Sequence, residues 1–277
     1  MQPALKKATT IEAKDISRLV KTHYSTIMPS FYETQSVFLS GIYKRYHSIE
    51  TAIIILCFAR NMHLEIIRQR ENDLNYNVSL ENFWYNFNKI EKPKDKITSV
   101  VSFTGIPKET VRRKIKKLSS LGFLESKNIS KGYSWTLSES EKNSYFKIID
   151  EEIKILSKFV NKLLSFMNLN LNMNDVEKEI KSQFSFYWYH FLSCELEWLK
   201  LWQTKLKDND LILIILQTII PTLKSVEKKS GSINLDNVFK IIGKSQDKKN
   251  INDIAVSAAS ISEVTGIPRA TCMRKLD

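Results

Sequence analysis

One twelve-residue sequence motif, called the repeated word below, occurs twice in the chain, and it constrains the fold more than any other feature. Residues 104–115 read TGIPKETVRRKI and residues 265–276 read TGIPRATCMRKL, so the copies align without a gap at an offset of 161 residues. The glycine of each copy tolerates a positive φ, and proline is favoured at the start of a helix. The first copy therefore predicts a sharp turn and then a helix that begins at Pro107, and the second copy predicts the same arrangement.

The sequence around the first copy predicts a helix, a turn, a second helix and a β-ribbon. On the second helix, apolar residues recur every three or four positions, which is typical of one buried face. The inward stripe consists of Val111, Ile115, Leu118 and Leu121. The outward face consists of Lys108, Glu109, Arg112, Arg113, Lys116 and Lys117. Gly122 ends the helix, and two β-prone runs, 123–126 and 133–137, flank a polar turn.

The words TGIPKETV, RRKIKKL and LGFLE resemble the winged helix-turn-helix transcription regulators, a broad group that includes the MarR-like and IclR-like proteins. The resemblance covers residues 97–137 and assigns no subfamily. It implies a helix-turn-helix over residues 97–121 and a wing over residues 123–137. It also implies that the outward face of the second helix binds double-stranded DNA.

The charge of the chain agrees with such a partner. Lys and Arg outnumber Asp and Glu by 42 to 30, and the formal net charge of +12 attracts polyanions such as nucleic acid. Residues 89–118 alone carry ten Lys or Arg against three acidic residues. More than half of the excess therefore lies beside or within the expected recognition helix.

The order of elements upstream of each copy is also repeated. Residues 78–87 (VSLENFWYNF) resemble residues 233–242 (INLDNVFKII), and the apolar residues 49–56 align with residues 209–216. Four further apolar residues, Phe31, Phe38, Leu39 and Ile42, fall over Phe191, Trp198, Leu199 and Trp202. We therefore expect two copies of one unit in the chain. The alternative is that only the two short words are related and the rest is ordinary helical patterning.

A long helical hairpin is expected between the units. Ser138 and Glu141 form a capping box that starts a long helix. This helix and the one after it carry apolar residues at heptad spacing, which favours packing of one against the other. The seams consist of Ile149, Ile153, Leu156, Val160, Leu163 and Met167, and of Ile180, Phe184, Tyr187, Phe191, Cys194, Trp198 and Leu201. The alternative use of one seam is to pair with a second chain, so a homodimer is open beside a pseudo-dimer within one chain.

The predicted fold is mostly α-helical, with tandem winged helix-turn-helix units, support helices and one small β-wing in the first unit. The expected domains are the first unit over residues 1–137, the hairpin over 138–206 and the second unit over 207–277. Support helices are expected over residues 10–24 with Thr10 as N-cap, over 49–67 after Ser48, and over 79–90.

The second unit stops at Asp277, inside its expected recognition helix and before any wing. We expect the sequence to be a fragment of a longer chain. The alternative is that the second helix-turn-helix, or second head, is degenerate and serves only in packing.

Positions on the two expected recognition helices assign roles, because side chains near the helix N-terminus reach base edges and flanking Lys or Arg contact phosphate. The candidates for base contact in the first copy are Lys108, Glu109, Thr110, Arg112 and Arg113. The candidates for phosphate contact are Lys116 and Lys117, and Lys127 and Lys131 of the wing are candidates for contact with the backbone or the minor groove. The candidates in the second copy are Arg269, Thr271, Arg274 and Lys275. Thr110 is equally a packing residue at the edge of the stripe.

The two heads are expected to read different sequences, because Ala270 and Met273 replace Glu109 and Arg112. The sequence shows no glycine-rich phosphate loop, no G-x-S-x-G and no acidic cluster spaced for magnesium. The four histidines lie apart from one another and from the cysteines. We therefore expect a non-enzyme without metal or cofactor. The aromatic residues within 184–191 are expected to pack in the core, with a ligand pocket or a base-stacking platform as alternatives.

Three widely spaced cysteines argue against a disulfide framework, and no apolar run approaches the length of a membrane span. Together with the absence of a signal-peptide core, this favours a cytoplasmic protein without membrane contact. The expected function is sequence-specific DNA binding by a transcriptional regulator. One alternative is a plasmid-type replication initiator, because proteins of that type resemble this chain in having two winged helices in one polypeptide. The other alternative is a protein-interaction scaffold that does not bind DNA.

Overall fold

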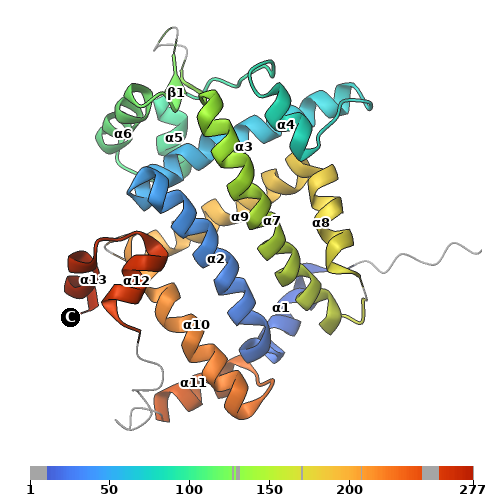
Figure 1. Ribbon diagram of the computed structural model, residues 1–277, viewed down its shortest axis with the longest axis vertical. Helices are drawn as coiled ribbons and strands as arrows, with labels where there is room; N and C mark the ends of the chain where they lie inside the picture. The colour runs from blue at the N-terminus through green and yellow to red at the C-terminus, as the bar shows by residue number, and fades with distance from the viewer. Residues whose placement is uncertain are drawn as a thin grey trace, which may run out of the picture.

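The computed structural model describes residues 11–126, 128, 132–169, 171–206, 208–244 and 256–276, and these are mostly α-helical, as the sequence predicts (Figure 1). The helices are α1 (Ala13–Thr22), α2 (Tyr24–Tyr46), α3 (Ile49–Asn72), α4 (Leu80–Asn86), α5 (Ile97–Thr104), α6 (Lys108–Ser120), α7 (Glu139–Phe166), α8 (Met173–Ser182), α9 (Phe184–Gln203), α10 (Leu211–Ser230), α11 (Leu235–Lys244), α12 (Ala258–Thr265) and α13 (Arg269–Leu276). The strands β1 (Leu124–Glu125) and β2 (Ser134–Trp135) pair antiparallel.

Side-chain caps start several of the helices at the predicted positions. The Ser48 hydroxyl accepts from the Thr51 N–H at α3, and the Ser79 hydroxyl caps α4 in the same way. The capping box of Ser138 and Glu141 starts α7. Thr10, the expected cap of the first helix, lies outside the described residues, and α1 follows Glu12. Within the part of the chain that the structure describes, no helix combines the length and the apolarity that crossing a bilayer requires.

The main core forms where helices from the two halves of the sequence cross over. The apolar helix α3 of the first half packs along α9 of the second, and the apolar helix α10 of the second half packs along α2 of the first (Figure 1). Ile54 and Leu39 in the first half, and Leu199 and Leu213 in the second, are fully buried. Neither half therefore buries its long apolar helix without the other.

Contacts between the halves come in equivalent pairs at an offset of 160 residues. The Phe38 and Phe191 rings lie 5.1 Å apart, and the rings of their counterparts, Trp198 and Phe31, lie 6.4 Å apart. Such reciprocity, in which residue i contacts j and the counterpart of j contacts that of i, is the property of an isologous interface.

The backbone shows the same correspondence. His23, which separates α1 from α2, has φ −110° and ψ 38°, and Gln183, which separates α8 from α9, has φ −113° and ψ 37°. The residue two positions after each break donates to the other half: Ser25 N–H to the Ile233 carbonyl (3.2 Å) and Ser185 N–H to the Val78 carbonyl (3.1 Å). These acceptors stand two residues before α11 and α4, respectively. The two halves therefore share local geometry as well as order of elements.

One contact joins two positions that correspond to each other, and a second joins positions one residue away from such correspondence. The Gln35 side-chain amide donates to the Glu195 carboxyl group, 160 residues further along, and both side chains are buried. The Ile49 N–H at the start of α3 donates to Asp210 Oδ1 at the start of α10 (3.2 Å). In an isologous arrangement a residue meets its own counterpart only near the twofold axis. An approximate twofold axis therefore passes by Gln35 and Glu195 and by the starts of α3 and α10.

The expected helical hairpin is only partly present. The expected second helix is broken at Gln183 into α8 and α9; α7 packs against α8 and α2, whereas α9 packs mainly along α3. The prediction failed because α9 finds a larger apolar partner in α3. Its buried face accordingly consists of Phe184, Trp188, Leu192, Leu196 and Leu199, while Cys194 and Leu201 of the expected seam are exposed.

Leu121 also differs from the prediction, because its side chain is 56 % exposed. Helix α6 ends at Ser120, Gly122 has φ 82°, and the Phe123 N–H bonds to the Leu118 carbonyl (2.9 Å). This Schellman turn points Leu121 outward and brings Phe123 over the core in its place.

The crossed packing predicts that both halves unfold together. Leu39→Ala and Leu199→Ala should each lower the free energy of unfolding by about 2 to 5 kcal/mol, because each removes a fully buried side chain. Both should shift one common transition in chemical denaturation followed by circular dichroism. The neighbouring Leu201→Ala, at a side chain 59 % exposed, is the control and should change stability by less than about 0.5 kcal/mol. Two separate transitions, of which each variant moves only one, would contradict the crossed packing.

Candidate nucleic-acid interface

The turn between α5 and α6 is built by the first repeated word. Gly105 has φ 70°, and the Thr104 hydroxyl donates to the Val100 carbonyl (2.8 Å) and accepts from the Ile106 N–H (3.2 Å). Only a residue without Cβ adopts this left-handed conformation at little cost. The threonine hydroxyl thus gives the Ile106 N–H, which follows the end of α5, a hydrogen-bond acceptor.

The second repeated word forms the same turn between α12 and α13. Gly266 has φ 78°, and the Thr265 hydroxyl donates to the Ile261 carbonyl (2.7 Å) and accepts from the Ile267 N–H (3.1 Å). Thr265 and Ile267 are fully buried, as is Cys272 at the position of Val111. The two words therefore specify the same local structure in two places.

Helix α6 divides into a buried face and an open cationic face. Val111, Ile115 and Leu118 anchor it to the core, with Pro107 as its N-cap rather than its first helical residue. The exposed charged side chains are those of Lys108, Glu109, Arg112, Arg113, Lys116 and Lys117. Glu109 and Arg112 form an exposed ion pair across one turn (3.2 Å). All of the outward residues that the sequence predicted on α6 are thus accessible to a partner.

A groove runs between the start of α5, the exposed side of α6 and the ribbon. Its lining residues are Ile97, Glu109, Thr110, Arg112, Arg113, Lys116 and Tyr133. Thr110 is half-buried, so it packs at the edge of the stripe and still faces this groove. Three of the lining side chains are Lys or Arg, which makes the groove suited to an anionic partner.

The ribbon is tied to the chain just before α5. Asp95 and Tyr133 exchange two backbone hydrogen bonds (2.8 and 2.9 Å), which adds a third segment beside β1 and β2. Gly132 has φ 105°, and a Cβ there would lie 2.8 Å from the Asp95 carbonyl oxygen. Glycine is therefore required where the ribbon passes this segment. Lys127 and Lys131, the predicted contacts of the wing, lie outside the described residues.

Lys114 fixes α6 to the start of α3, a role that the sequence reasoning missed. Its ammonium group lies 3.1 Å from Ser48 Oγ, 3.0 Å from Thr51 Oγ1 and 3.4 Å from a Glu50 carboxylate oxygen. The feature of the sequence that could have indicated this role is the position of Lys114 beside Ile115, at the border between the buried and the exposed face of the helix. Three oxygen partners for one cation hold the helix at a fixed angle to the body.

Lys275 is placed in the same way, although the sequence predicted it to face DNA. It corresponds to Lys114, its side chain is 12 % exposed, and it forms an ion pair with Asp208 just before α10. On the rest of α13, Arg269, Met273 and Arg274 are exposed and Thr271 is half-buried. The outward cationic face of α13 is thus smaller than that of α6.

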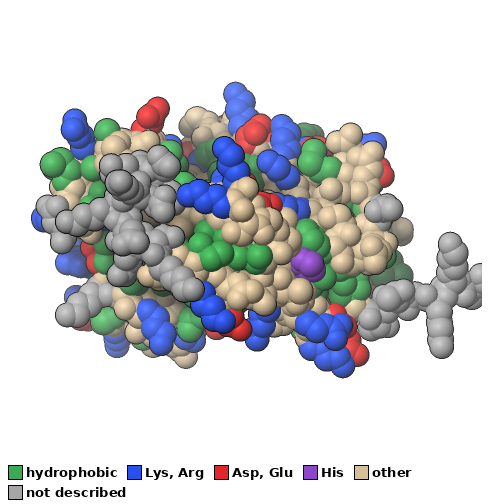
Figure 2. Space-filling view, turned by 90° about the horizontal axis from the view of Figure 1, so that it is seen from below, with side chains coloured by type: hydrophobic (Ala, Val, Ile, Leu, Met, Phe, Trp, Pro, Cys, Tyr) green, Lys and Arg blue, Asp and Glu red, His purple; other side chains and the backbone are tan. Residues whose placement is uncertain are grey.

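The two basic helices, α6 and α13, both lie along one edge of the molecule, at the left in Figure 1. On the face seen from below, Lys and Arg side chains are spread among acidic and apolar ones (Figure 2). Net charge alone therefore does not locate an interface. The clustering of exposed cations on α6 beside a groove does.

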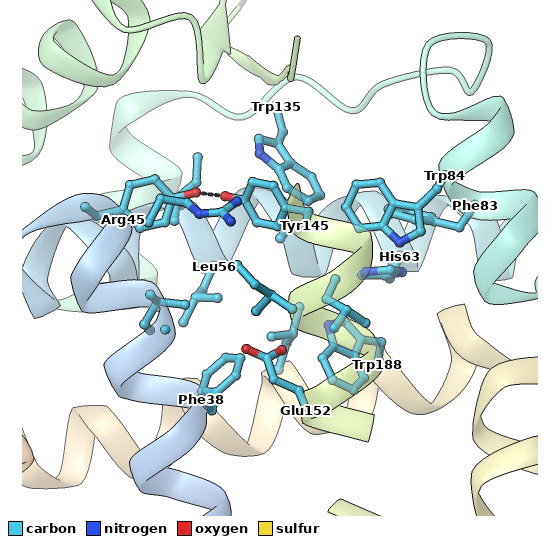
Figure 3. Close-up of a pocket in the computed structure, with 18 residues that line it drawn as sticks. Phe38, Arg45, Leu56, His63, Phe83, Trp84, Trp135, Tyr145, Glu152 and Trp188 are labelled. Carbon is cyan, nitrogen blue, oxygen red and sulfur yellow. Dashed lines mark hydrogen bonds between the residues drawn. The ribbon is translucent and has the colours of Figure 1, made fainter. Parts of the chain in front are cut away.

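A cluster of aromatic rings connects the ribbon to the body (Figure 3). Trp135 of β2 packs edge-on against Trp84 of α4 and Tyr145 of α7, at centroid distances of 6.4 and 5.9 Å. The Arg45 guanidinium lies 3.4 Å from the centre of the Tyr145 ring, and the Tyr145 hydroxyl is hydrogen-bonded to that of Tyr46. The position of the ribbon is therefore set by α2, α4 and α7 together.

Glu152 of α7 lies below this cluster, with its carboxyl group between Phe38 and Trp188 (Figure 3). Burial raises its pKa from 4.5 to about 8, an effect that Arg45 opposes and the nearby Glu195 increases. The group is therefore largely neutral at pH 7.

Among the described residues, no group of His, Cys, Asp or Glu side chains is arranged to hold a metal ion. Comparison of the chain with protein-family models, with curated proteins and with solved structures finds no match.

The raised pKa of Glu152 predicts a pH-dependent stability. A carboxyl group whose folded-state pKa is raised stabilises the fold fully below about pH 4.5, and this contribution is lost as the pH rises toward 8. Glu152→Gln should therefore gain stability relative to the parent protein as the pH rises, by more than about 1 kcal/mol at pH 8. Denaturation at a series of pH values measures the difference. The exposed Glu197→Gln is the control, and a pH-independent difference for Glu152→Gln would contradict the prediction.

The contacts of Lys114 predict that it stabilises α6. Lys114→Met should lower the free energy of unfolding by about 1 to 3 kcal/mol, because it removes a charged donor from three oxygens. The matched control is Lys116→Met, which removes the same charge from an exposed position two residues away. Equal stability of the two variants in urea denaturation would show that the Lys114 contacts are not formed.

Proposed function

We propose that the chain is a sequence-specific, double-stranded DNA-binding protein that acts as a transcriptional regulator. It contains two copies of one unit, and each copy carries a helix-turn-helix, the first of them with a wing. Helices α6 and α13 are the recognition helices. The proposal includes a cytoplasmic location, in which Cys57, Cys194 and Cys272 stay as free thiols.

The observation that carries this proposal is the open cationic face of α6. Its apolar side is held in the core, its exposed side carries five Lys or Arg residues, and a groove separates it from a two-stranded ribbon. A recognition helix needs this combination, because it must enter the major groove while neighbouring cations contact phosphates. The equivalent turn before α13 supports a second, weaker head on the same edge of the molecule.

The role of each exposed residue on α6 follows from its distance from the N-terminus of the helix. Lys108, Arg112 and Arg113 lie on its first two turns and contact base edges, where Arg pairs with guanine through two hydrogen bonds. Glu109 either accepts from a cytosine amino group or keeps Arg112 oriented. Lys116 and Lys117 neutralise phosphates. On α13, Arg269, Thr271 and Arg274 make the contacts, and Lys275 positions the helix through Asp208.

The two-headed arrangement implies an imperfectly repeated DNA site. Two recognition helices related by an approximate twofold axis read half-sites about 34 to 36 Å apart, or a multiple of that distance. The half-sites differ, because Ala270 and Met273 stand where α6 has Glu109 and Arg112. Regulation would follow from binding alone: the bound protein covers or bends the promoter and thereby changes the access of the polymerase to it. No covalent step is involved.

Selection from a random duplex library, followed by footprinting, tests the proposal. The expected result is one motif with two unlike half-sites, and an affinity whose logarithm falls with the logarithm of salt at about −0.9 per phosphate contact. No selection and a flat salt response would reject DNA binding and favour a protein partner. Selection of repeats that act at a replication origin without affecting transcription would favour an initiator.

The assigned roles predict different effects for two cations on α6. Arg113→Ala should weaken binding to the selected duplex by about 1 to 3 kcal/mol and relax the preference at one base pair. Lys117→Ala should weaken binding to all duplexes alike and reduce the salt slope by about 1. Both effects are measured by titration of labelled duplexes at several salt concentrations.

The matched control is Lys228→Ala, which removes the same charge from an exposed position near the end of α10. It should leave binding to the selected duplex unchanged. An equal loss for Lys228→Ala and Lys117→Ala would mean that only net charge matters. A changed base preference for Lys117→Ala would overturn its assignment to phosphate.

A further inference from the structure

The exposed face of α13 carries two apolar side chains where α6 carries an ion pair. Ala270 and Met273 are both exposed, and Met273 is 52 % exposed. They are three positions apart, so they lie next to each other on one face of the helix and are called the apolar pair below. At the same positions of α6, Glu109 and Arg112 form their ion pair. The two proposed recognition helices therefore differ in chemistry at the middle of their outward faces.

The structure presents these positions in the same way on both helices. Gly105 and Gly266, in the turns before them, have φ 70° with ψ 1° and φ 78° with ψ 1°, respectively. Val111 of α6 and Cys272 of α13, which face inward, are both fully buried. Because the entry turn and the inward face agree, residues at an offset of 161 point outward at equivalent places. The apolar pair and the ion pair thus occupy the same place on the two heads.

The residues on either side of the apolar pair remain cationic. Arg269 and Arg274 are exposed on α13, and they correspond to Lys108 and Arg113 of α6. The second head therefore keeps its attraction for an anionic partner, while the charged hydrogen-bonding groups between the cations are lost. The apolar pair has no side-chain donor, so it gains affinity by covering apolar surface of its partner.

In the major groove of DNA, the thymine 5-methyl group is the apolar group on the base edges, and the other groups are hydrogen-bond donors and acceptors. We propose that Ala270 and Met273 read thymine methyl groups, so that the second head selects a half-site that contains thymine at these contacts. The inference rests on the proposed DNA binding and names the base chemistry of the second head. In the first head, Glu109 and Arg112 read hydrogen-bonding groups instead.

Replacing thymine by uracil tests the contact, because it removes the methyl group and keeps the base pair. In the duplex selected by the protein, uracil in the half-site of the second head should weaken binding about fourfold for each methyl group contacted. Uracil in the other half-site should change the affinity by less than about twofold, which makes it the internal control. The half-site of the first head is the one whose base preference Arg113→Ala relaxes.

The failure of this inference differs from the failure of DNA binding. A selected duplex that does not respond to uracil in the second half-site, or a second half-site without thymine, would overturn the reading of methyl groups alone. If no duplex is selected, the proposed function and the inference both fall.

A variant of the apolar pair assigns the contact to its residue. With Met273→Ala, the loss caused by uracil should shrink from about fourfold to less than about twofold, because two changes that remove one contact are not additive. The matched control is Met173→Ala, at an exposed methionine that starts α8 on the opposite side of the molecule (Figure 1). It should leave the affinity and the uracil effect unchanged. Additive losses from Met273→Ala and uracil would overturn the assignment.

An exchange between the heads gives a result that a merely structural role would not. Ala270→Glu combined with Met273→Arg gives the second head the residues of the first at these positions. Selection with this double variant should return two half-sites that are more alike, and uracil should no longer weaken binding. Both positions are exposed, and circular dichroism checks that the fold is kept. Selection of an unchanged second half-site would refute the proposal.

Discussion

The burial of each half's apolar helix against the other half is the constraint on which the rest of the structure depends. Helix α3 needs α9, and α10 needs α2, so the core is complete only when the two halves cross. The pairs Phe38 with Phe191 and Phe31 with Trp198 show that the same contact is made twice in opposite directions. Every surface feature, including the edge that carries α6 and α13, is positioned by this crossed core.

The cationic helices are linked to that core at one junction. Lys114 holds α6 at the start of α3, and Lys275 holds α13 at Asp208 beside the start of α10. The starts of α3 and α10 are themselves joined by the bond from Ile49 to Asp210. The spacing of the two helices is therefore a property of the folded body, and a flexible linker does not set it. For the proposed regulator, this rigidity favours a narrow range of half-site separations.

The sequence predicted local structure well and long-range packing less well. The turns at Gly105 and Gly266, the caps at Ser48 and Ser138 and the outward cations of α6 depend on a few neighbouring residues, so the pattern was sufficient. The break at Gln183 and the partner of α9 depend on the whole core. The spacing of apolar residues identifies the buried face of a helix, but it does not indicate which other helix packs against that face. The same limit explains Lys275, since its position is determined by Asp208, far away in sequence.

The pair at the centre of the molecule has a consequence for how such a protein can be assembled. On the twofold axis of a true homodimer each side chain must face an identical copy, so glutamine meets glutamine or glutamate meets glutamate. Gln35 instead faces Glu195, and a donor amide is matched to a carboxyl group. Unlike residues can stand there only because the two halves differ in sequence, and here one polypeptide carries both halves. Covalent fusion thus permits asymmetry at the axis, and it lets a substitution alter one head while its twin stays as it was.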